Sequence, residues 1–377
     1  MKFLDLKAQY KSIKKEIDAA IKRVLDSCVF IGGAEVEGLE KEVAGFCGTK
    51  YAIGVNSGTD ALFLSLKALG IKEGDEVITT PFTFIATAEI IANLGARPVF
   101  VDIAPGTFNI DILKIEKIIA DLSSSRRKKL KAIIPVHIFG QMADMDEIMK
   151  IAKKYRLSVV EDSAQAMGAE YKGRKAGSMG DLGCLSFFPS KNLGAYGDGG
   201  MIITSDKDLA DKINLFKSHG SSPKEKYLNL VLGTNSRLDA LQAAILRAKL
   251  KHLSVWSKER AKKASYYNKF LKRIGDIKIS AIDKDKTHIF HQYTVRTKFR
   301  DKLQKYLNEK GIPTMIYYPL PLHLQPAFKY LGYKRGDFPE SEKAASEVLS
   351  LPIYPEIGRK DQDYIIQKIK EFYEKEN

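Results

Sequence analysis

The chain has 377 residues, 44% of them hydrophobic and 28% charged, which is an ordinary composition for a soluble globular protein. Because this length exceeds the usual size of a single hydrophobic core, we expect two domains, a large one over 1–250 and a smaller one over 251–377. The N-terminus lacks an apolar run of signal-peptide length, and nowhere do about 18 apolar residues follow one another. We therefore expect a cytoplasmic protein without a membrane span.

The net charge of +15 raises the question of a nucleic-acid partner. Lysines are spread along the whole chain, however, and the densest basic run, Arg126–Lys129, is expected in a surface loop without interleaved aromatic residues. We therefore expect a solvated basic surface and no nucleic-acid partner. The cysteines, Cys28, Cys47 and Cys184, are scattered without metal-ligand spacing, and we expect reduced, packed thiols and no metal site.

The first 25 residues have apolar residues at helical spacing mixed with Lys and Glu, which predicts one amphipathic helix. From residue 51 onward, short apolar runs typical of strands alternate with helical patterns. Such an alternation indicates a mostly parallel sheet with helices on both faces. The predicted strands are 51–55, 77–80, 98–101, 132–136 and 158–161, and the predicted helices are 59–69, 83–94 and 144–155.

Beyond Arg237 the pattern changes. A long helical region is predicted over 238–271, and its Trp256, the only tryptophan, is interpreted as a packing residue. A shorter α+β region follows, with a strand over 291–296 and a helix over 300–310. This change is the reason for placing the domain boundary near residue 250.

Polar clusters follow three of the predicted strands, at the strand ends where ligands gather in parallel sheets. They are 56–59, 81–84 and Asp162. The first cluster precedes a predicted helix, whose free N–H groups could bind a phosphate. A helix N-cap explains it equally well, because Ser, Thr and Asp are favoured there in any case. The common position of the clusters predicts one shared site.

Asp162 and Lys191 carry the chemistry of that site. Asp162 ends an apolar strand, where an unpaired carboxylate is costly, so it would pair with a protonated pyridine nitrogen or, as a plainer alternative, cap a helix or form a salt bridge. Lys191 lies among apolar and small residues that limit its solvation, between the candidate phosphate ligand Ser186 and a glycine-rich stretch. A lysine able to form a Schiff base and an aspartate at a strand end are two parts that a pyridoxal phosphate enzyme needs.

Two further motifs narrow the function. The glycines of 197–200 have the wrong spacing for a dinucleotide fingerprint and precede a predicted strand over 201–204, which argues against a nicotinamide dehydrogenase. The segment 317–326 gathers tyrosines, a histidine and a glutamine in a proline-rich loop. Such a loop either lines a sugar site or is a rigid surface crossing, and the residues alone favour the crossing.

Together these motifs resemble the pyridoxal-phosphate-dependent nucleotide-sugar aminotransferases of the DegT/DnrJ/EryC1/StrS family. The resemblance runs from Phe3 to Pro355 and is most specific over 56–62, 161–166, 186–200 and 235–243. It implies the aspartate aminotransferase fold (fold type I), an α/β fold with a mostly parallel sheet and a smaller C-terminal α+β domain. The chain departs from the family at 317–319, where the family often has His-Tyr-Pro and this sequence has Tyr-Tyr-Pro.

The resemblance also implies a role for each matching residue. Lys191 would be the catalytic residue, which bonds the cofactor pyridoxal 5'-phosphate and shuttles protons. The protein would be a homodimer with shared active sites, in which Asn235 reaches the phosphate bound to the neighbouring subunit. The cofactor ligands would be Gly58, Thr59, Phe84, Asp162, Gln165, Ser186, Lys191 and Asn235. The substrate ligands would be Arg237, Tyr317, Tyr318 and His323.

The implied reaction is a ping-pong transamination, in which L-glutamate gives its amino group to the cofactor and a nucleotide-linked keto sugar then receives it. The loop at His323–Pro326 inclines the expectation toward a 3-oxo sugar over a 4-oxo sugar. A sugar dehydratase of this fold carries histidine in place of the reactive lysine, so Lys191 argues against that activity. A non-catalytic regulator that binds nucleic acid would need none of Asp162, Lys191 and Asn235.

Overall fold

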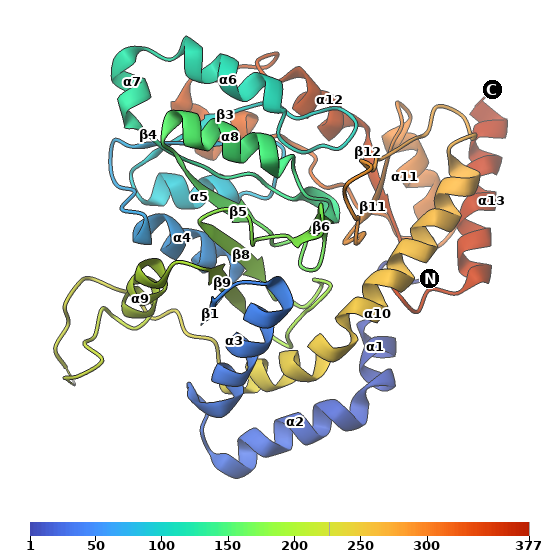
Figure 1. The fold of residues 1–377 in the computed structure, drawn as a ribbon. Coiled ribbons are helices and arrows are strands. Elements are labelled where there is room, and N and C mark those ends of the chain that lie inside the picture. Colours follow the sequence, from blue (N-terminus) through green and yellow to red (C-terminus); the bar gives the residue numbers. More distant parts are fainter. Residues whose placement is uncertain (226, 377) are drawn as a thin grey trace.

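A seven-stranded sheet forms the centre of the structure, a computed structural model that describes residues 1–225 and 227–376 (Figure 1). The strands follow the spatial order β1-β9-β8-β5-β4-β2-β3. All neighbouring pairs are parallel except those of β9, which runs antiparallel to both of its neighbours. The strands are β1 (Tyr51–Val55), β2 (Glu76–Thr79), β3 (Arg97–Phe100), β4 (Leu130–Ile133), β5 (Ser158–Asp162), β8 (Leu182–Ser186) and β9 (Gly200–Thr204).

Helices cover both faces of this sheet, because successive side chains of a strand point to opposite faces and nearly all of them are apolar. In β9, for example, Ile202 packs toward one set of helices, while Met201 and Ile203 pack toward the other. The first set is α4 (Gly58–Ala68), α5 (Ala86–Asn93) and α9 (Lys207–Phe216). The second set is α3 (Gly33–Cys47), α6 (Ile112–Asp121), α8 (Met145–Tyr155) and the first half of α10 (Ala240–Leu271).

The C-terminal part packs around a three-stranded antiparallel sheet in the order β10-β11-β12. Helix α10 is 32 residues long and belongs to both parts, with Leu246 in a core beside the large sheet and Tyr267 in the C-terminal core. The predicted boundary near residue 250 lies inside this helix and stays a prediction. The C-terminal elements are β10 (Lys278–Ile279), β11 (Tyr293–Arg296), α11 (Arg300–Glu309), α12 (Pro339–Glu347), β12 (Val348–Leu351) and α13 (Arg359–Glu376).

Three local expectations are wrong. The N-terminal region forms two helices, α1 (Leu6–Ser12) and α2 (Lys14–Ser27), because the backbone leaves the helical region at Ile13, whose side chain is buried. The basic run expected in a loop forms the short helix α7 (Ser124–Lys129), whose N-terminus is capped by Ser123 and whose basic residues lie at the favourable C-terminal end. The expectation of a packed thiol is also wrong for Cys28, which is exposed because it ends α2 as its C-cap in a left-handed conformation, whereas Cys47 and Cys184 are buried as expected.

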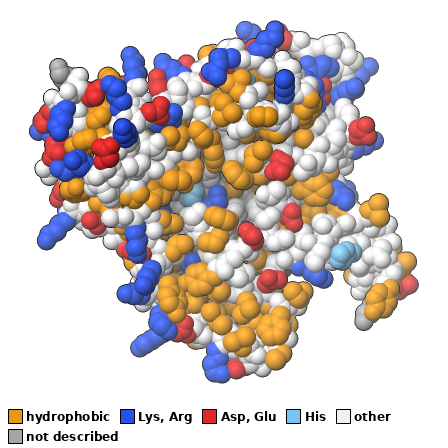
Figure 2. Space-filling model, turned by 180° about the vertical axis from the view of Figure 1, so that it is seen from behind, with side chains coloured by type: hydrophobic (Ala, Val, Ile, Leu, Met, Phe, Trp, Pro, Cys, Tyr) orange, Lys and Arg blue, Asp and Glu red, His pale blue; other side chains and the backbone are white. Residues whose placement is uncertain are grey.

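The remaining short elements are the hairpin of β6 (Glu170–Tyr171) and β7 (Arg174–Lys175) and three 3-10 turns. Lys and Arg side chains are scattered over the face shown in Figure 2, whereas hydrophobic side chains gather on its lower part and on the projecting segment between α9 and α10. In the described part of the chain, no helix is both long and apolar enough to cross a membrane.

Candidate active site

A cavity of about 790 Å³ lies at the ends of the central strands, between the two parts of the molecule. Its position follows from the topology, because the carboxyl ends of parallel strands meet at one edge of the sheet. Side chains from the loops after β1, β2, β5 and β8 face it together with residues of the C-terminal part. Nine of the predicted site residues line the cavity: Gly58, Thr59, Phe84, Asp162, Gln165, Ser186, Lys191, Tyr317 and Tyr318.

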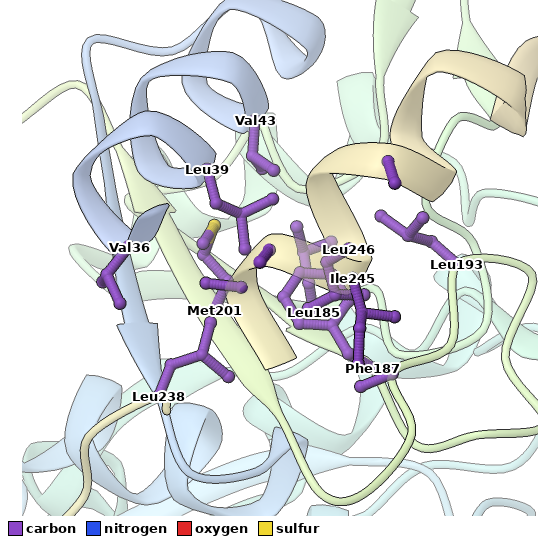
Figure 3. Close-up of a cluster of buried hydrophobic side chains, with 14 of the residues drawn as sticks. Val36, Leu39, Val43, Leu185, Phe187, Leu193, Met201, Leu238, Ile245 and Leu246 are labelled. Atoms are coloured by element: carbon purple, nitrogen blue, oxygen red, sulfur yellow. The ribbon is translucent and has the colours of Figure 1, made fainter. Parts of the chain in front are cut away.

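Lys191 is carried by an irregular loop between β8 and β9. Phe187 and Leu193 of this loop point into the hydrophobic cluster formed with α3 and α10 (Figure 3), so the loop is pinned on both sides of the lysine. Burial lowers the pKa of Lys191 to about 8, against the opposing effect of the Asp162 charge. A lysine with this pKa reaches its nucleophilic neutral form near physiological pH.

Asp162 ends β5 and is only 6% exposed. Its Oδ2 accepts a hydrogen bond of 2.7 Å from the Thr87 hydroxyl, and its Oδ1 accepts one of 3.2 Å from the Ala164 backbone N–H. Within residues 1–225 and 227–376, no Lys or Arg forms an ion pair with this carboxylate. A buried carboxylate that faces a cavity without a cationic partner fits the protonated ring nitrogen of pyridoxal phosphate.

The side chain of Glu161, on the other face of β5, fixes the backbone beneath Asp162. It is fully buried and accepts hydrogen bonds from His137 Nε2 at 2.8 Å and from the backbone N–H groups of Gly177, Met179 and Gly180. Burial alone would raise the pKa of Glu161, but the bond from His137 and the backbone donors outweigh it and lower the pKa. This network holds the strand that ends in the aspartate.

The N-terminus of α4 forms an anion cradle at the cavity. Ser57 caps the helix by accepting a hydrogen bond from Asp60 N, which leaves the N–H groups of Gly58 and Thr59 without an acceptor among the described residues. A side chain at position 58 would be excluded, because a Cβ there would lie 2.7 Å from Ser186 Cβ. The free N–H groups, the helix dipole and the hydroxyls of Thr59 and Ser186 suit a phosphate. The cavity therefore fits pyridoxal phosphate at two places, with the Asp162 carboxylate at its ring nitrogen and the N-terminus of α4 at its phosphate.

Gln165 connects the floor of the cavity to its C-terminal wall. Its Oε1 accepts a 2.8 Å hydrogen bond from Phe139 N, which orients the amide so that Nε2 donates to the Tyr318 hydroxyl at 3.0 Å. The ring of Phe84 is 55% exposed, and its centroid lies 6.2 Å from that of Tyr318. Tyr317 packs against the same tyrosine. These aromatic rings enclose the space next to Lys191 and Asp162.

Three predicted site residues do not line this cavity. Asn235 and Arg237 are exposed and lie where the chain returns from the projecting segment between α9 and α10 (Figure 1). His323 is 2% exposed, and its Nε2 lies 3.1 Å from Glu342, so its ring is held inside the C-terminal part. The roles assigned to these three residues stay predictions.

Several lining residues were missed by the sequence analysis. Thr87 had a signal, since it follows Thr83 by one turn in the predicted helix over 83–94. Arg260 and His291 had none, because they belong to segments far along the chain whose contact with the cavity depends on tertiary packing. Residues 1–4 also line the cavity, and nothing in their composition indicates a site.

Comparison with known proteins finds relatives along nearly the whole chain. Residues 11–370 match the model of the DegT/DnrJ/EryC1/StrS aminotransferase family. The chain is 52% identical over 372 residues to "Pleiotropic regulatory protein" of Geobacillus stearothermophilus, with 98% of each chain covered. It is 45% identical over 355 residues to UDP-2-acetamido-2-deoxy-3-oxo-D-glucuronate aminotransferase of Pseudomonas aeruginosa, which covers 94% of this chain and 95% of that one.

A solved structure is similarly close. The crystal structure of S. venezuelae DesV in complex with a ketimine intermediate superposes with a TM-score of 0.94 at 42% sequence identity. The match covers 99% of this chain and 98% of DesV. The α/β fold predicted from the sequence is thus shared with a solved structure.

Proposed function

Because the chain belongs to the DegT/DnrJ/EryC1/StrS aminotransferase family, we propose that it transfers the amino group of L-glutamate to a 3-oxo sugar nucleotide. The protein is a nucleotide-sugar aminotransferase whose cofactor is pyridoxal 5'-phosphate. The relative from P. aeruginosa is named for a 3-oxo sugar, which supports the proposed position of the keto group. The observation that carries the proposal is the meeting of a lysine of lowered pKa and an unpaired buried aspartate in one cavity.

The cavity residues divide the cofactor between them. Gly58, Thr59 and Ser186 would hold the phosphate, and Asp162 would hold the protonated ring nitrogen. Bound pyridoxal phosphate supplies an aldehyde that exchanges amino groups and a ring that takes up the electron pair left on carbon after deprotonation. Thr87 and Ala164 orient the Asp162 carboxylate for this pairing through their hydrogen bonds.

Lys191 is the proposed base and acid. Its neutral Nζ would take the proton from the α-carbon of the amino donor and deliver it to the cofactor carbon that carries the aldehyde (C4′), and the same movement in reverse would serve the keto sugar. The lowered pKa keeps the neutral amine accessible near pH 8. The surrounding aromatic rings, among them Phe84 and Tyr318, would limit access of water to the reacting atoms.

A second subunit would complete the site. Asn235 and Arg237 are exposed and outside the cavity of their own chain, as expected of residues that serve a neighbour. The segment that precedes them carries exposed apolar side chains, including Leu230 and Leu232, which a partner would cover. Both observations support a homodimer in which Asn235 reaches the cofactor phosphate bound by the partner, and Arg237 reaches the carboxylate of the amino donor or an acidic group of the sugar bound there.

Tyr317, Tyr318 and His323 are proposed to serve the sugar nucleotide. The two tyrosines line the cavity directly, whereas His323 is buried outside the cavity lining and would act indirectly. A cytoplasmic location is inferred from the substrate class and from the exposed free thiol of Cys28.

A regulatory role without catalysis is the second candidate, because the relative from G. stearothermophilus carries a regulatory name. A pure regulator would have no use for a buried aspartate without a cationic partner or for a lysine enclosed beside it. Turnover decides between the two candidates, since regulation alone requires none.

The test uses the purified protein with pyridoxal phosphate, L-glutamate and a panel of 3-oxo and 4-oxo sugar nucleotides, with product masses as the readout. We expect amino-sugar formation from 3-oxo substrates, and none with Lys191→Ala. Borohydride should fix the cofactor on Lys191 and leave Lys249, a second buried lysine of similar pKa, unlabelled. Turnover by Lys191→Ala, or labelling elsewhere, contradicts the proposed mechanism.

The shared site has its own test. Lys191→Ala and Asn235→Ala should each be inactive, and a mixture of the two should regain part of the wild-type activity through hybrid dimers that contain one intact site. A mixture of Lys191→Ala with Asp162→Ala is the matched control, because those two residues belong to the same cavity. Equal recovery in both mixtures, or none in the first, would refute the shared site.

A further inference from the structure

Asn192, the residue that follows the reactive lysine, is tied to a distant segment of the C-terminal part. The side chain is 7% exposed. Its Nδ2 donates a 3.2 Å hydrogen bond to the carbonyl of Ile289, and its Oδ1 lies 3.2 Å from His291 Nδ1. Both partners belong to residues 289–291, which lead into β11. One amide therefore joins the reactive loop to this segment at two points.

The bond to Ile289 settles the direction of the bond to His291. Because the Ile289 carbonyl can only accept, the Asn192 NH₂ group must face it, and Oδ1 must face the imidazole. His291 Nδ1 is then the donor, and the neutral ring keeps Nε2 as an acceptor. Burial, together with the nearby charges of Lys191 and Arg260, lowers the pKa of His291 well below its ordinary value, which keeps the ring neutral.

Residues 289–291, to which Asn192 is bonded, are themselves fixed by contacts with two other parts of the chain. Ile289 N donates to the carbonyl of Gly140 at 3.0 Å, and a Cβ at Gly140 would lie 2.8 Å from Ile289 Cγ1. Arg260 Nη1, from α10, donates to the carbonyls of Phe290 at 3.1 Å and Ile353 at 2.9 Å. Phe290 adopts a positive φ of 48°, a conformation that persists only when its surroundings impose it.

We propose that Asn192 and His291 are positioning residues that fix the Nζ of Lys191 in the cavity through the hydrogen bond between them. This inference rests on the proposed role of Lys191. The loop around Lys191 has no regular structure, so side-chain ties of this kind determine where the amine lies. Misplacing a reacting group by about 1 Å can reduce a rate by about 100-fold.

The two nitrogens of His291 allow a sharp test, because two amide side chains mimic them separately. His291→Asn can place an NH₂ near the Nδ1 position and keep the bond to Asn192, whereas His291→Gln places its amide near Nε2. His291→Phe keeps the ring volume without either nitrogen. If the bond to Asn192 is the function of His291, the first variant retains activity and the other two lose it.

The primary readout is the rate constant of the half-reaction with L-glutamate, followed by cofactor absorbance in the holoenzyme. Asn192→Ala, His291→Phe and His291→Gln should lower it about 10- to 100-fold with less than about a threefold change in KM, whereas His291→Asn should stay within about fivefold of wild type. Asn268→Ala is the control, since Asn268 accepts a bond of 2.7 Å from Tyr293 in the C-terminal part. It should leave the rate constant unchanged.

A second readout does not depend on turnover. The pH dependence of Lys191 acetylation in the full chain without cofactor, measured by mass spectrometry, should show a midpoint near 8 that rises in Asn192→Ala and His291→Phe as the amine gains solvent. The midpoint should not move in His291→Asn or Asn268→Ala. An unchanged midpoint in Asn192→Ala overturns the proposal.

A double variant separates a joint effect from two independent ones. If both residues act through one bond, Asn192→Ala with His291→Phe should be no more than about twofold slower than the slower single variant. Multiplied losses, or activity in His291→Gln with none in His291→Asn, overturn the positioning role. Full turnover by Lys191→Ala would instead refute the proposed function, so the two failures are distinguishable.

Discussion

Replacing Lys249 with methionine should remove a pH-dependent cost to the stability of the fold. Lys249 is 1% exposed on α10, and its ammonium group donates to the Gly194 carbonyl and lies 4.7 Å from the centre of the Tyr196 ring. Burial lowers its pKa from 10.5 to about 8. The unfolded chain therefore binds a proton more tightly at this residue than the folded chain does.

The magnitude follows from linkage. Below pH 8 the buried ammonium group costs the folded state about 3 kcal/mol relative to a neutral amine, and at pH 9.5 the cost is about 1.5 kcal/mol. The cost fades as the pH rises from the folded pKa to the unfolded pKa. The free energy of unfolding of wild type, measured relative to that of Lys249→Met, should thus rise by about 2 kcal/mol from pH 7 to pH 9.5. The carbonyl of Gly194 loses its donor in the variant at every pH, so that loss cancels from the comparison.

Urea unfolding of the holoenzyme at several pH values and one protein concentration measures this difference. Lys262→Met is the matched control, because Lys262 lies on the same helix with a side chain 71% exposed. Its stability should parallel wild type within about 0.5 kcal/mol at both pH values. Stability curves of wild type and Lys249→Met that run parallel from pH 7 to pH 9.5 would refute the reasoning.

Two further changes test the framework of the site. Gly58→Ala should weaken pyridoxal phosphate binding at least about 10-fold, measured by fluorescence titration, because the new methyl group meets Ser186 at 2.7 Å and displaces the cradle; unchanged affinity would contradict the cradle. Glu161→Gln should lower the free energy of unfolding by about 3–5 kcal/mol at pH 7 in urea titrations, because His137 and three backbone donors lose a buried carboxylate. The loss should shrink toward low pH, since the stabilisation by a carboxylate of lowered pKa disappears as it is protonated in wild type; a loss that does not vary with pH would contradict it.

The sequence predicts six of the seven central strands, because their apolar runs are locally encoded, whereas β8 (Leu182–Ser186) is not among the predicted strands. The helix expected over 59–69 is α4 (Gly58–Ala68), and the strand expected over 158–161 is β5 (Ser158–Asp162). The break between α1 and α2 escapes prediction, because Ile13 is apolar and keeps the helical pattern although its backbone leaves the helix. Periodicity reports which face of a segment is buried and cannot detect a single non-helical residue within it.

The candidate site divides in the same way. Gly58, Asp162 and Lys191 each stand beside a recognisable strand end or loop, and each lines the cavity. Arg260 and His291 also line it, yet they come from the middle of a long helix and from an irregular segment. No local pattern distinguishes them from packing residues, because their roles arise from contacts with residues that are far away in the sequence.

The sequence around Lys191 reveals it as a site residue, but its reactivity depends on tertiary contacts, as the roles of Arg260 and His291 do. Its neighbours in sequence mark it as a candidate, but its lowered pKa comes from burial, and part of the enclosing wall is Arg260, His291 and Tyr318. Removal of that wall would return the amine to water and its pKa toward 10.5. A motif search can therefore find the lysine, whereas its competence as a base near pH 8 requires that the C-terminal part be docked on the large sheet.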